Sequence, residues 1–593
     1  MSKLVIVESP SKAKTIQKYL GRDYEVMASF GHIRDLPKSR MGVDIESGFK
    51  PNYMVMSDKK EILSKLKEAA EASEFVYLAT DPDREGEAIA WHLAYLLGLD
   101  VENENRVAFN EITKSGVSKG MTAPHKINMD LVDAQQARRV LDRIVGYKLS
   151  PFLWKKVKSG LSAGRVQSVA LKLVVDREKE IEAFLPQEFW TVDAKFLHQR
   201  KGFVARLALD KKGDKIAIEN SEQAKRIMAD LEGAEYSVSS VKKGTRNRQP
   251  APPFITSTLQ QEAARKLGFT GQRTMRVAQQ LYEGVDIPGL GTTGLITYMR
   301  TDSLRISEEA RAAANEYILG KYGEKYLPEK PRYFKSKQGA QDAHEAIRPS
   351  IIDLSPDKLG DALTSDQLKL YRLIWSRFIA SLMSVCVQNT VSADIEGAGY
   401  IFKASGYSVK FDGFTVLYEE GRDDESKDSE GALPEMKEGD AIKAKSIEPN
   451  QHFTQPPARY TEATLTKALE ENGIGRPSTF ATIISNILQR SYIEREKKLL
   501  KPTLLGTTVS DLVSQHFKSI VDVKFTAEME NNLDDIEEGK REWVETIDEF
   551  YGGFKTTIEK AEKELDGVRV KVPDEVTEVI CEKCGRNMVI KSS

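Results

Sequence analysis

Short apolar runs alternate with helical patterns over residues 1–148. Strands are predicted at Leu4–Val7 and Phe75–Thr80, and each is followed by a helical pattern, at residues 11–20 and 85–99. Strands that alternate with helices are typical of a parallel sheet with helices on its faces. We therefore expect an N-terminal α/β domain with a parallel sheet.

The hydrophobic pattern changes beyond residue 148. Residues 149–186 have a helical pattern, whereas residues 187–253 and 386–455 alternate with the period of two that half-buried strands show. The largely helical residues 254–385 separate these two β-rich blocks, and residues 456–572 give helix, turn and helix followed by a β-wing. The pattern predicts a multidomain α/β and α+β protein with three further domains. These are a helical, winged-helix-like domain (149–186 and 456–572), a β-rich hinge domain (187–253 and 386–455) and an inserted domain (254–385).

The composition is that of a soluble globular protein, with 593 residues of which 30% are charged and 40% hydrophobic. The longest apolar run, Ala88–Leu99, is shorter than the ~18 residues that cross a bilayer, and the first residues lack a signal-peptide pattern. Three cysteines cannot form a disulfide framework for a chain of this length. We expect a cytoplasmic protein that does not bind membranes.

The net charge of -2 conceals a local segregation of charge. Between Arg138 and Lys172 there are nine basic residues and one acidic residue, Asp142, whereas residues 419–440 are rich in acid. A basic strip on a nearly neutral protein is typical of a groove that binds a polyanion. The chain has no G-x-x-x-x-G-K-[ST] phosphate loop, so we expect no ATP hydrolysis.

Carboxylates follow both predicted strands of the N-terminal domain. Glu8 ends the first strand and Asp81, Asp83 and Glu85 end the second, at the sheet edge where α/β proteins bind ligands. Oxygen ligands without His or Cys favour Mg²⁺ over zinc, although a solvated acidic turn would leave the same pattern. Lys12 in the first turn of the next helix indicates an anionic ligand, because a cation is otherwise unfavourable there.

Further motifs along the chain carry a family resemblance. They are GHIRDLP (31–37), FNEIT (109–113), SAGRVQS (162–168), GLITYMRTDS (294–303), DAHEAIRP (342–349), GIGRPSTF (473–480) and FTAEME (525–530). Together with the carboxylate motifs they make the chain resemble the bacterial type IA DNA topoisomerases, in their topoisomerase I branch, over nearly its whole length. The resemblance implies a TOPRIM Rossmann-like domain within a toroidal core.

The resemblance also implies an activity. Tyr298 of the TYMRTDS motif would attack a DNA strand and form a 5′-phosphotyrosyl intermediate, and strand passage and religation would then relax negatively supercoiled DNA without ATP. Because an unperturbed tyrosine pKa of ~10 is too high for attack at neutral pH, Arg300 is expected to favour the phenolate and to hold the phosphate. Glu8 would act as general acid and base, Lys12 would bind the phosphate, and His344 would hydrogen bond within the site.

Metal and DNA ligands are implied in the same way. The carboxylates of Glu8, Asp81, Asp83 and Glu85 would hold Mg²⁺. Single-stranded DNA binds to cations that contact its phosphates and to an aromatic ring that stacks on a base, and the basic strip offers both. A solvated basic helix face would give the same pattern. The expected DNA-binding residues are His32, Arg138, Arg139, Asp142, Arg143, Tyr147, Ser162, Arg165, Gln167, Arg476 and Ser478.

Cys581 and Cys584 supply two of the four ligands of a zinc ribbon. Residues 573–593 are therefore expected to be the start of a truncated ribbon that binds no zinc, in a protein that acts as a monomer. Two alternatives remain open at this point: a topoisomerase III-like decatenase and a non-catalytic single-stranded DNA-binding protein.

Overall fold

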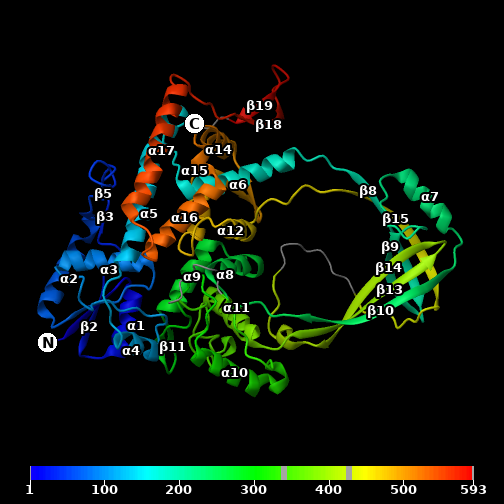
Figure 1. Cartoon of the computed structure of the whole chain (residues 1–593), viewed down its shortest axis with the longest axis horizontal. Helices are drawn as coiled ribbons and strands as arrows, with labels where there is room; N and C mark the ends of the chain where they lie inside the picture. Colours follow the sequence, from blue (N-terminus) through cyan, green and yellow to red (C-terminus); the bar gives the residue numbers. More distant parts are fainter. Residues whose placement is uncertain (1, 336–343, 422–430, 591–593) are drawn as a thin grey trace.

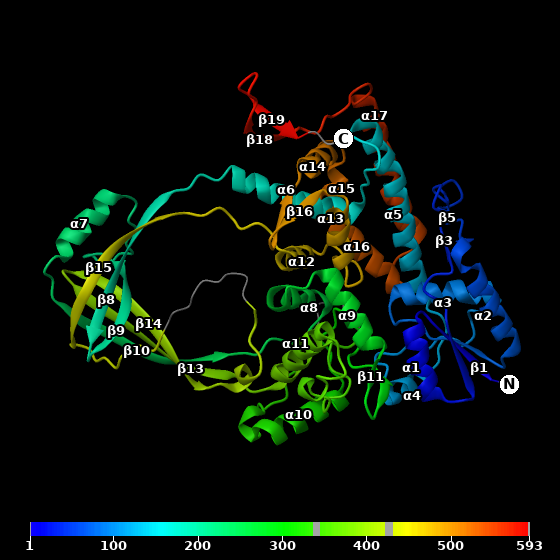
Figure 2. The same ribbon diagram turned by 180° about the vertical axis from the view of Figure 1, so that it is seen from behind.

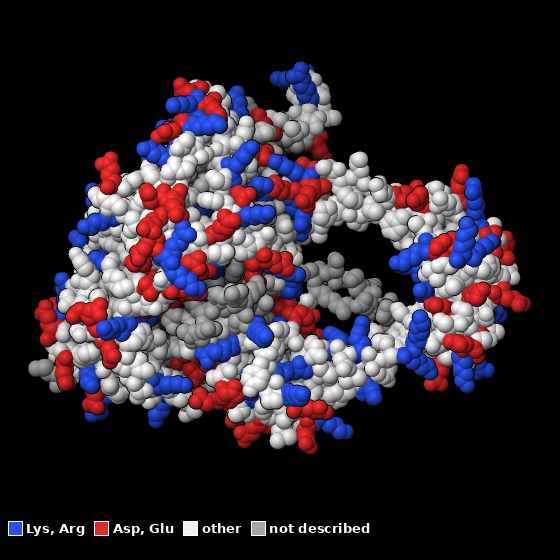
Figure 3. Space-filling view, in the orientation of Figure 1, with Lys and Arg blue, Asp and Glu red and all other residues white. Residues whose placement is uncertain are grey.

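The computed structural model describes residues 2–335, 344–421 and 431–590. The chain forms a ring, in which a strand-built arm lies opposite the helical bulk of the protein (Figures 1 and 2). The space-filling view shows the opening between the two (Figure 3). The predicted toroidal, multidomain α/β and α+β architecture is confirmed.

The N-terminal region holds a three-stranded parallel sheet in the order β2-β1-β7. The strands are β1 (Lys3–Val7), β2 (Tyr24–Ala28) and β7 (Val76–Leu78), and the helices are α1 (Pro10–Leu20), α2 (Lys60–Ala72), α3 (Arg84–Leu97) and α4 (Lys114–Met121). Leu4 to Val7 of the central strand are fully buried, as an apolar run without alternation predicts. Because β1 and β7 run parallel with Ile6 opposite Leu78, the residues that follow the two strands lie at the same sheet edge.

Four shorter strands lie between β2 and α2. They form two antiparallel pairs, β3 (Arg34–Asp35) with β6 (Met54–Val55) and β4 (Val43–Asp44) with β5 (Lys50–Pro51).

The arm of the ring is a closed barrel in the strand order β10-β13-β14-β9-β8-β15. Its elements are β8 (Glu188–His198), β9 (Lys201–Leu209), α7 (Ser221–Leu231), β10 (Tyr236–Arg248), β13 (Cys386–Gly397), β14 (Tyr400–Phe411) and β15 (Ala441–Phe453). Phe196, Ile395 and Phe402 form part of its core. Burial alternates along these strands, which confirms the period-two pattern in both β-rich blocks.

The region between β10 and β13 is mainly helical. It contains α8 (Thr256–Glu262), α9 (Gly271–Glu283), the hairpin of β11 (Val285–Ile287) and β12 (Gly291–Thr293), α10 (Glu308–Tyr322) and α11 (Ser365–Leu382). Leu295 and Ile296 of this region share one hydrophobic core with Val5 and Val7 of β1. The inserted region therefore packs directly against the N-terminal sheet.

The remaining helices come from two separate stretches of sequence. They are α5 (Met129–Lys156), α6 (Arg165–Glu182), α12 (Glu462–Glu471), α13 (Phe480–Gln489), α14 (Leu504–His516), α15 (Lys518–Val521), α16 (Val523–Glu537) and α17 (Trp543–Glu564). The predicted wing is the hairpin of β16 (Ile493–Glu496) and β17 (Leu499–Pro502). The helical pattern predicted over 149–186 is wrong at residues 157–164, which separate α5 from α6 and include Gly160 with φ of 81°.

The last described residues form a hairpin of β18 (Glu575–Ile580) and β19 (Asn587–Ile590). No helix among the described residues is long and apolar enough to span a membrane. Part of the acidic segment, residues 422–430, and the first two residues of the DAHEAIRP motif lie outside the described residues.

Candidate active site and strand path

The parallel strands bring Glu8 and Asp81 together around a buried lysine. Ser9 caps α1, and Lys12 in the first turn of that helix is only 1% exposed. Its Nζ lies 3.1 Å from Glu8 Oε2 and 2.9 Å from Asp81 Oδ1. Burial and the Asp81 charge raise the pKa of Glu8 to about 7, although Lys12 opposes this shift. The lysine predicted to bind phosphate is therefore engaged by two carboxylates.

Asp83 links the end of β7 to the inserted region. It caps α3 by accepting a hydrogen bond from the Gly86 amide (2.8 Å), and its other oxygen accepts one from the Tyr298 hydroxyl at 2.5 Å. Arg300 Nη1 lies 3.4 Å from the same oxygen. Although burial opposes the shift, Arg300 and the Tyr298 hydroxyl hold the pKa of Asp83 below its usual value.

The expected effect of Arg300 on the pKa of Tyr298 is present, but opposing effects are larger. Arg300 lowers the pKa of Tyr298, whereas burial and the Asp83 carboxylate raise it, and together they leave the pKa well above its usual value. Arg300 thus favours the phenolate as predicted, but burial and the Asp83 charge outweigh it. Here Tyr298 is a protonated donor, 2% exposed, held against a carboxylate.

The Tyr298 backbone is fixed by both regions that meet at the site. The Tyr298 amide donates to the Asn110 carbonyl (2.8 Å) and the Gly294 amide to the Ile112 carbonyl (2.9 Å), both in the N-terminal region. A Cβ at Gly294 would lie 2.5 Å from the Tyr282 carbonyl oxygen, so this close approach requires glycine. The tyrosine thus lies at the boundary of the two regions.

His344 reaches the same site from the other end of the inserted region. Its Nε2 hydrogen bonds to the Pro82 carbonyl, so Nε2 carries the proton, and its ring centroid lies 5.7 Å from that of Tyr298. The buried Nδ1 has no hydrogen-bond partner among the described residues. It borders a cavity of about 450 Å³ whose lining includes Asp83, Arg300 and Arg476.

The basic strip is matched by carboxylates that the sequence analysis missed. Arg138 Nη2 lies 3.2 Å from Glu530 Oε2, and Arg165 Nη2 lies 2.9 Å from Glu530 Oε1 and 3.6 Å from Asp142 Oδ1. The Arg165 side chain is fully buried, so it does not line an open groove. The FTAEME motif, which ends at Glu530, was the one signal for this partner.

Arg139, Arg143 and Tyr147 hold the GHIRDLP segment rather than a solvated face. Arg139 Nε donates to Asp35 Oδ1 (3.0 Å), Arg143 Nη1 to the Pro37 carbonyl (3.0 Å), and the Tyr147 hydroxyl to the Lys38 carbonyl (2.5 Å). The Arg143 guanidinium lies 5.0 Å from the centroid of the Tyr147 ring.

A second cavity, of about 250 Å³, continues from the first. The two share Glu85, Gln135 and Arg138 in their linings, and the second is also lined by His32, whose Nε2 lies 2.6 Å from Glu85 Oε1. The two cavities together run along the predicted strand path from His344 to Asp142.

The last three predicted DNA-binding residues differ in their surroundings. Ser478 lines the first cavity beside Arg476. Ser162 is tied through its backbone to the Tyr492 hydroxyl, and the buried Gln167 Nε2 has no hydrogen-bond partner among the described residues.

The predicted metal ligands do not form one cluster. Asp81 binds Lys12, Asp83 binds Tyr298 and Arg300, and Glu85 binds His32. No group of three or more possible metal ligands occurs among the described residues. The donors are nevertheless all oxygens, and the Asp81 charge raises the Glu8 pKa, so a divalent cation would relieve the repulsion between them.

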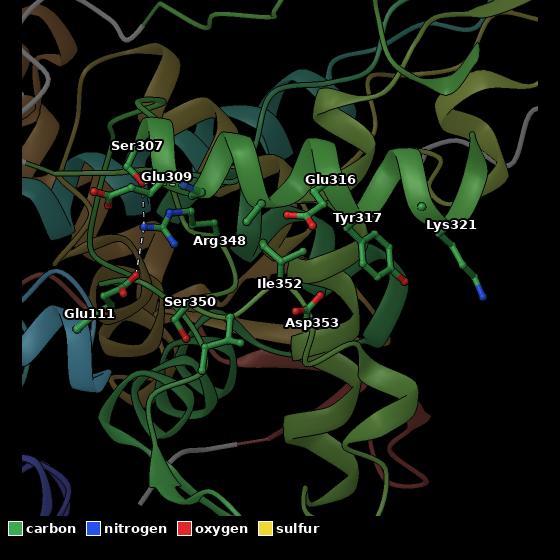
Figure 4. Close-up of a pocket in the computed structure, with 15 residues that line it drawn as sticks. Glu111, Ser307, Glu309, Glu316, Tyr317, Lys321, Arg348, Ser350, Ile352 and Asp353 are labelled. Carbon is green, nitrogen blue, oxygen red and sulfur yellow. Dashed lines mark hydrogen bonds and ion pairs between the residues drawn. The ribbon is translucent and has the colours of Figure 1, made fainter. Parts of the chain in front are cut away.

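A larger cavity, of about 670 Å³, contains none of the predicted site residues. It lies between the N-terminal region and α10, and its lining includes Glu111, Tyr317 and Asp353 (Figure 4). Beside it, Arg348 Nη2 lies 3.2 Å from Glu111 Oε2 and Arg348 Nε lies 2.8 Å from Glu345 Oε2. This cavity lies at the same boundary between regions, and Tyr298 does not line it.

Comparisons with known proteins agree with this geometry. Residues 3–112 match the Toprim domain, and residues 126–548 match the DNA topoisomerase family. The chain is similar to full-length topoisomerase I from Thermotoga maritima, with 40% sequence identity and a TM-score of 0.86, over 99% of this chain and 94% of that one.

The chain therefore belongs to the bacterial type IA DNA topoisomerases, in the topoisomerase I branch. It is an enzyme that relaxes DNA by cleaving a single strand. The predicted family and activity are confirmed, and the non-catalytic alternative is excluded.

Proposed function

We propose that Tyr298 is the nucleophile that cleaves the strand and that Asp83 receives its proton. The 2.5 Å hydrogen bond from the phenol to Asp83 Oδ2 is the observation that carries this proposal. A bond forms between the phenolic oxygen and the phosphorus, and the bond from phosphorus to the 3′ oxygen breaks. One phosphodiester replaces another, so religation needs no ATP.

Glu8 is the candidate acid for the departing 3′ oxygen and the base on religation, because it ends the neighbouring strand beside Asp81. Lys12 and Arg300 supply positive charge to the scissile phosphate once that phosphate competes for their carboxylate partners. His344, whose Nδ1 has no hydrogen-bond partner among the described residues, is the candidate to hydrogen bond to a phosphate oxygen.

Glu8, Asp81, Asp83 and Glu85 would hold Mg²⁺, with Asp81 and Asp83 nearest the reacting groups. When bound, Mg²⁺ supplies positive charge that offsets these carboxylates and the phosphate. Oxygen donors at two adjacent strand ends support magnesium over zinc for this role.

The substrate proposed for the two connected cavities is a single strand within negatively supercoiled DNA, bound by one monomer. Arg138 lies where the cavities join, and Arg476 and Ser478 line the first of them. The GHIRDLP segment, held by Arg139 and Arg143, forms part of the wall beyond.

Covalent capture of a labelled oligonucleotide on a denaturing gel tests the nucleophile. Tyr298→Phe should abolish the adduct and leave single-strand affinity within about threefold, because one hydroxyl contributes only ~1 kcal/mol. Tyr282→Phe is the matched control, since this buried tyrosine lies 5.3 Å from the Tyr298 ring and hydrogen bonds to the Phe109 carbonyl. An adduct from the Tyr298 variant would show that the nucleophile lies elsewhere.

A further inference from the structure

One face of α16 carries three carboxylates that the proposed chemistry does not use. Glu530, Asp534 and Glu537 follow the i, i+4, i+7 spacing of a single helix face. They bind guanidinium groups from four separate segments: Arg84 at the start of α3, Arg138 in α5, Arg165 at the start of α6, and Arg476 before α13. Arg84 directly follows Asp83, so the network reaches the candidate active site.

The network has a sealed part and an open part. Glu530 and Arg165 are 1% and 0% exposed, and neither lines the two connected cavities. The Asp534 side chain is 26% exposed and lines the 450 Å³ cavity that also contains Arg300 and His344. A strand that occupies this cavity therefore meets Asp534.

Two guanidinium groups share the Asp534 carboxylate. Arg476 Nη2 and Nε lie 2.6 and 3.0 Å from Oδ2, and Arg84 Nη2 lies 3.2 Å from Oδ1. Arg84 Nη1 is buried and has no hydrogen-bond partner in the part of the chain that the structure describes, so the group has a donor to spare. A phosphodiester carries one negative charge on two non-bridging oxygens, as a carboxylate does, and accepts the same forked contacts.

We propose that the Asp534 carboxylate occupies the place of one backbone phosphate of the DNA strand, and that Arg84 and Arg476 exchange Asp534 for this phosphate when the strand binds. This inference rests on the proposed function, because it takes the cavity to be the strand path. It makes Arg84 a DNA contact, and Asp534 a competitor of the substrate.

The exchange has a measurable sign. Removing the Asp534 charge removes the competing anion, so Asp534→Asn should bind single-stranded DNA more tightly, on the order of tenfold. The salt dependence of binding should also become steeper, by roughly 0.7. In the unmodified protein the displaced Asp534 carboxylate attracts a cation again, and this uptake offsets the cation that the strand releases. If Asp534 merely braced the arginines, its loss would weaken binding.

Fluorescence anisotropy with a labelled oligothymidylate tests this, with every protein carrying Tyr298→Phe so that no strand is cleaved. Glu528→Gln is the control, because Glu528 is exposed on the same helix. The proposal expects tighter binding and a steeper slope for Asp534→Asn alone. An equal gain in affinity for both variants would show an effect of overall charge only. Weaker binding by Asp534→Asn would show that Asp534 holds the arginines in place. Either result overturns the proposal.

Oligonucleotides with one uncharged methylphosphonate linkage locate the exchanged phosphate. When the methylphosphonate replaces one particular phosphate, Asp534→Asn should no longer increase the affinity, because Arg84 and Arg476 then have no phosphate charge to bind in either protein. A gain that persists at every linkage overturns the exchange. Covalent capture is measured separately, in proteins that keep Tyr298. A missing adduct there would refute the proposed nucleophile, whereas the anisotropy result alone decides the exchange.

Discussion

Asp83 and Arg84 are neighbours in the chain, yet they belong to two junctions of different charge balance. At the first junction Asp83 meets Tyr298 and Arg300, and three carboxylates (Glu8, Asp81 and Asp83) face two cations, Lys12 and Arg300. At the second junction Arg84 meets α16, where four guanidinium groups face three carboxylates. The first junction has more carboxylates than cations, whereas at the second Asp142, 3.6 Å from Arg165, brings the carboxylates to four and the charges balance.

The difference indicates what each junction takes from outside. A surplus carboxylate favours a cation, and in an all-oxygen site that cation is Mg²⁺. A guanidinium paired with an exposed carboxylate such as Asp534 can exchange it for another anion, and its planar fork suits a phosphodiester. Metal dependence should therefore depend on the first junction and salt dependence on the strand path, so variants can separate the two.

The largest effect is expected at the first junction. Asp81→Ala combined with Asp83→Ala should lower plasmid relaxation by about 100-fold or more and remove its response to Mg²⁺, because the donors for the metal are lost. Some slow cleavage of single strands should remain without metal, since Lys12 and Arg300 still face the phosphate, although the proposed acceptor of the Tyr298 proton is lost. Relaxation assays across a magnesium titration, with EDTA as the metal-free point, measure this.

The control for that variant is Glu68→Ala with Glu71→Ala, two exposed acids on α2. This control should keep both activity and magnesium response. The salt slope of single-strand binding should change little in either protein. Relaxation of the aspartate variant that still rises normally with Mg²⁺ would break the assignment of metal to the first junction.

The sequence was most informative where local pattern and motif coincide. The alternation of apolar runs located β1 and β7, and two parallel strands necessarily place Glu8 and Asp81 at one edge. The position of Tyr298 beside these acids followed from family resemblance, because no local pattern indicates that a residue 215 positions away hydrogen bonds to Asp83.

What the sequence could not supply were the partners across the fold. The count of basic residues from Arg138 to Lys172 was correct, but Arg138 and Arg165 are both paired with Glu530, almost 400 positions away from Arg138. The sign of the Tyr298 pKa shift was missed for the same reason, since it depends on burial and on Asp83. A charge pattern in the sequence shows which charged side chains a segment carries, whereas ion pairs with distant residues decide which of these side chains remain available to a ligand.

An intermediate effect is expected on the strand path beyond the second junction. Arg139→Ala with Arg143→Ala should weaken single-strand binding and make its salt dependence shallower by roughly 0.7 per lost phosphate contact. The magnesium response should stay unchanged, because neither residue contacts the first junction. Anisotropy titrations at several salt concentrations give both values.

The matched control carries Lys148→Ala and Lys155→Ala, which remove two exposed cations from the same helix, α5. Equal slopes for the two double variants would show that Arg139 and Arg143 only hold the GHIRDLP segment in place. A change in magnesium response would show instead that the two junctions are not separable.

The smallest effect is expected in the β18–β19 hairpin, which lies outside both junctions. Cys581 and Cys584 provide two thiols, and the described residues add no third ligand, so a tetrahedral zinc site is incomplete. Metal analysis should find no stoichiometric zinc, and Cys581→Ser with Cys584→Ser should leave oligonucleotide cleavage, magnesium response and salt slope unchanged. One zinc per chain, or a loss of cleavage in the serine variant, would show that this hairpin takes part in the function of the ring.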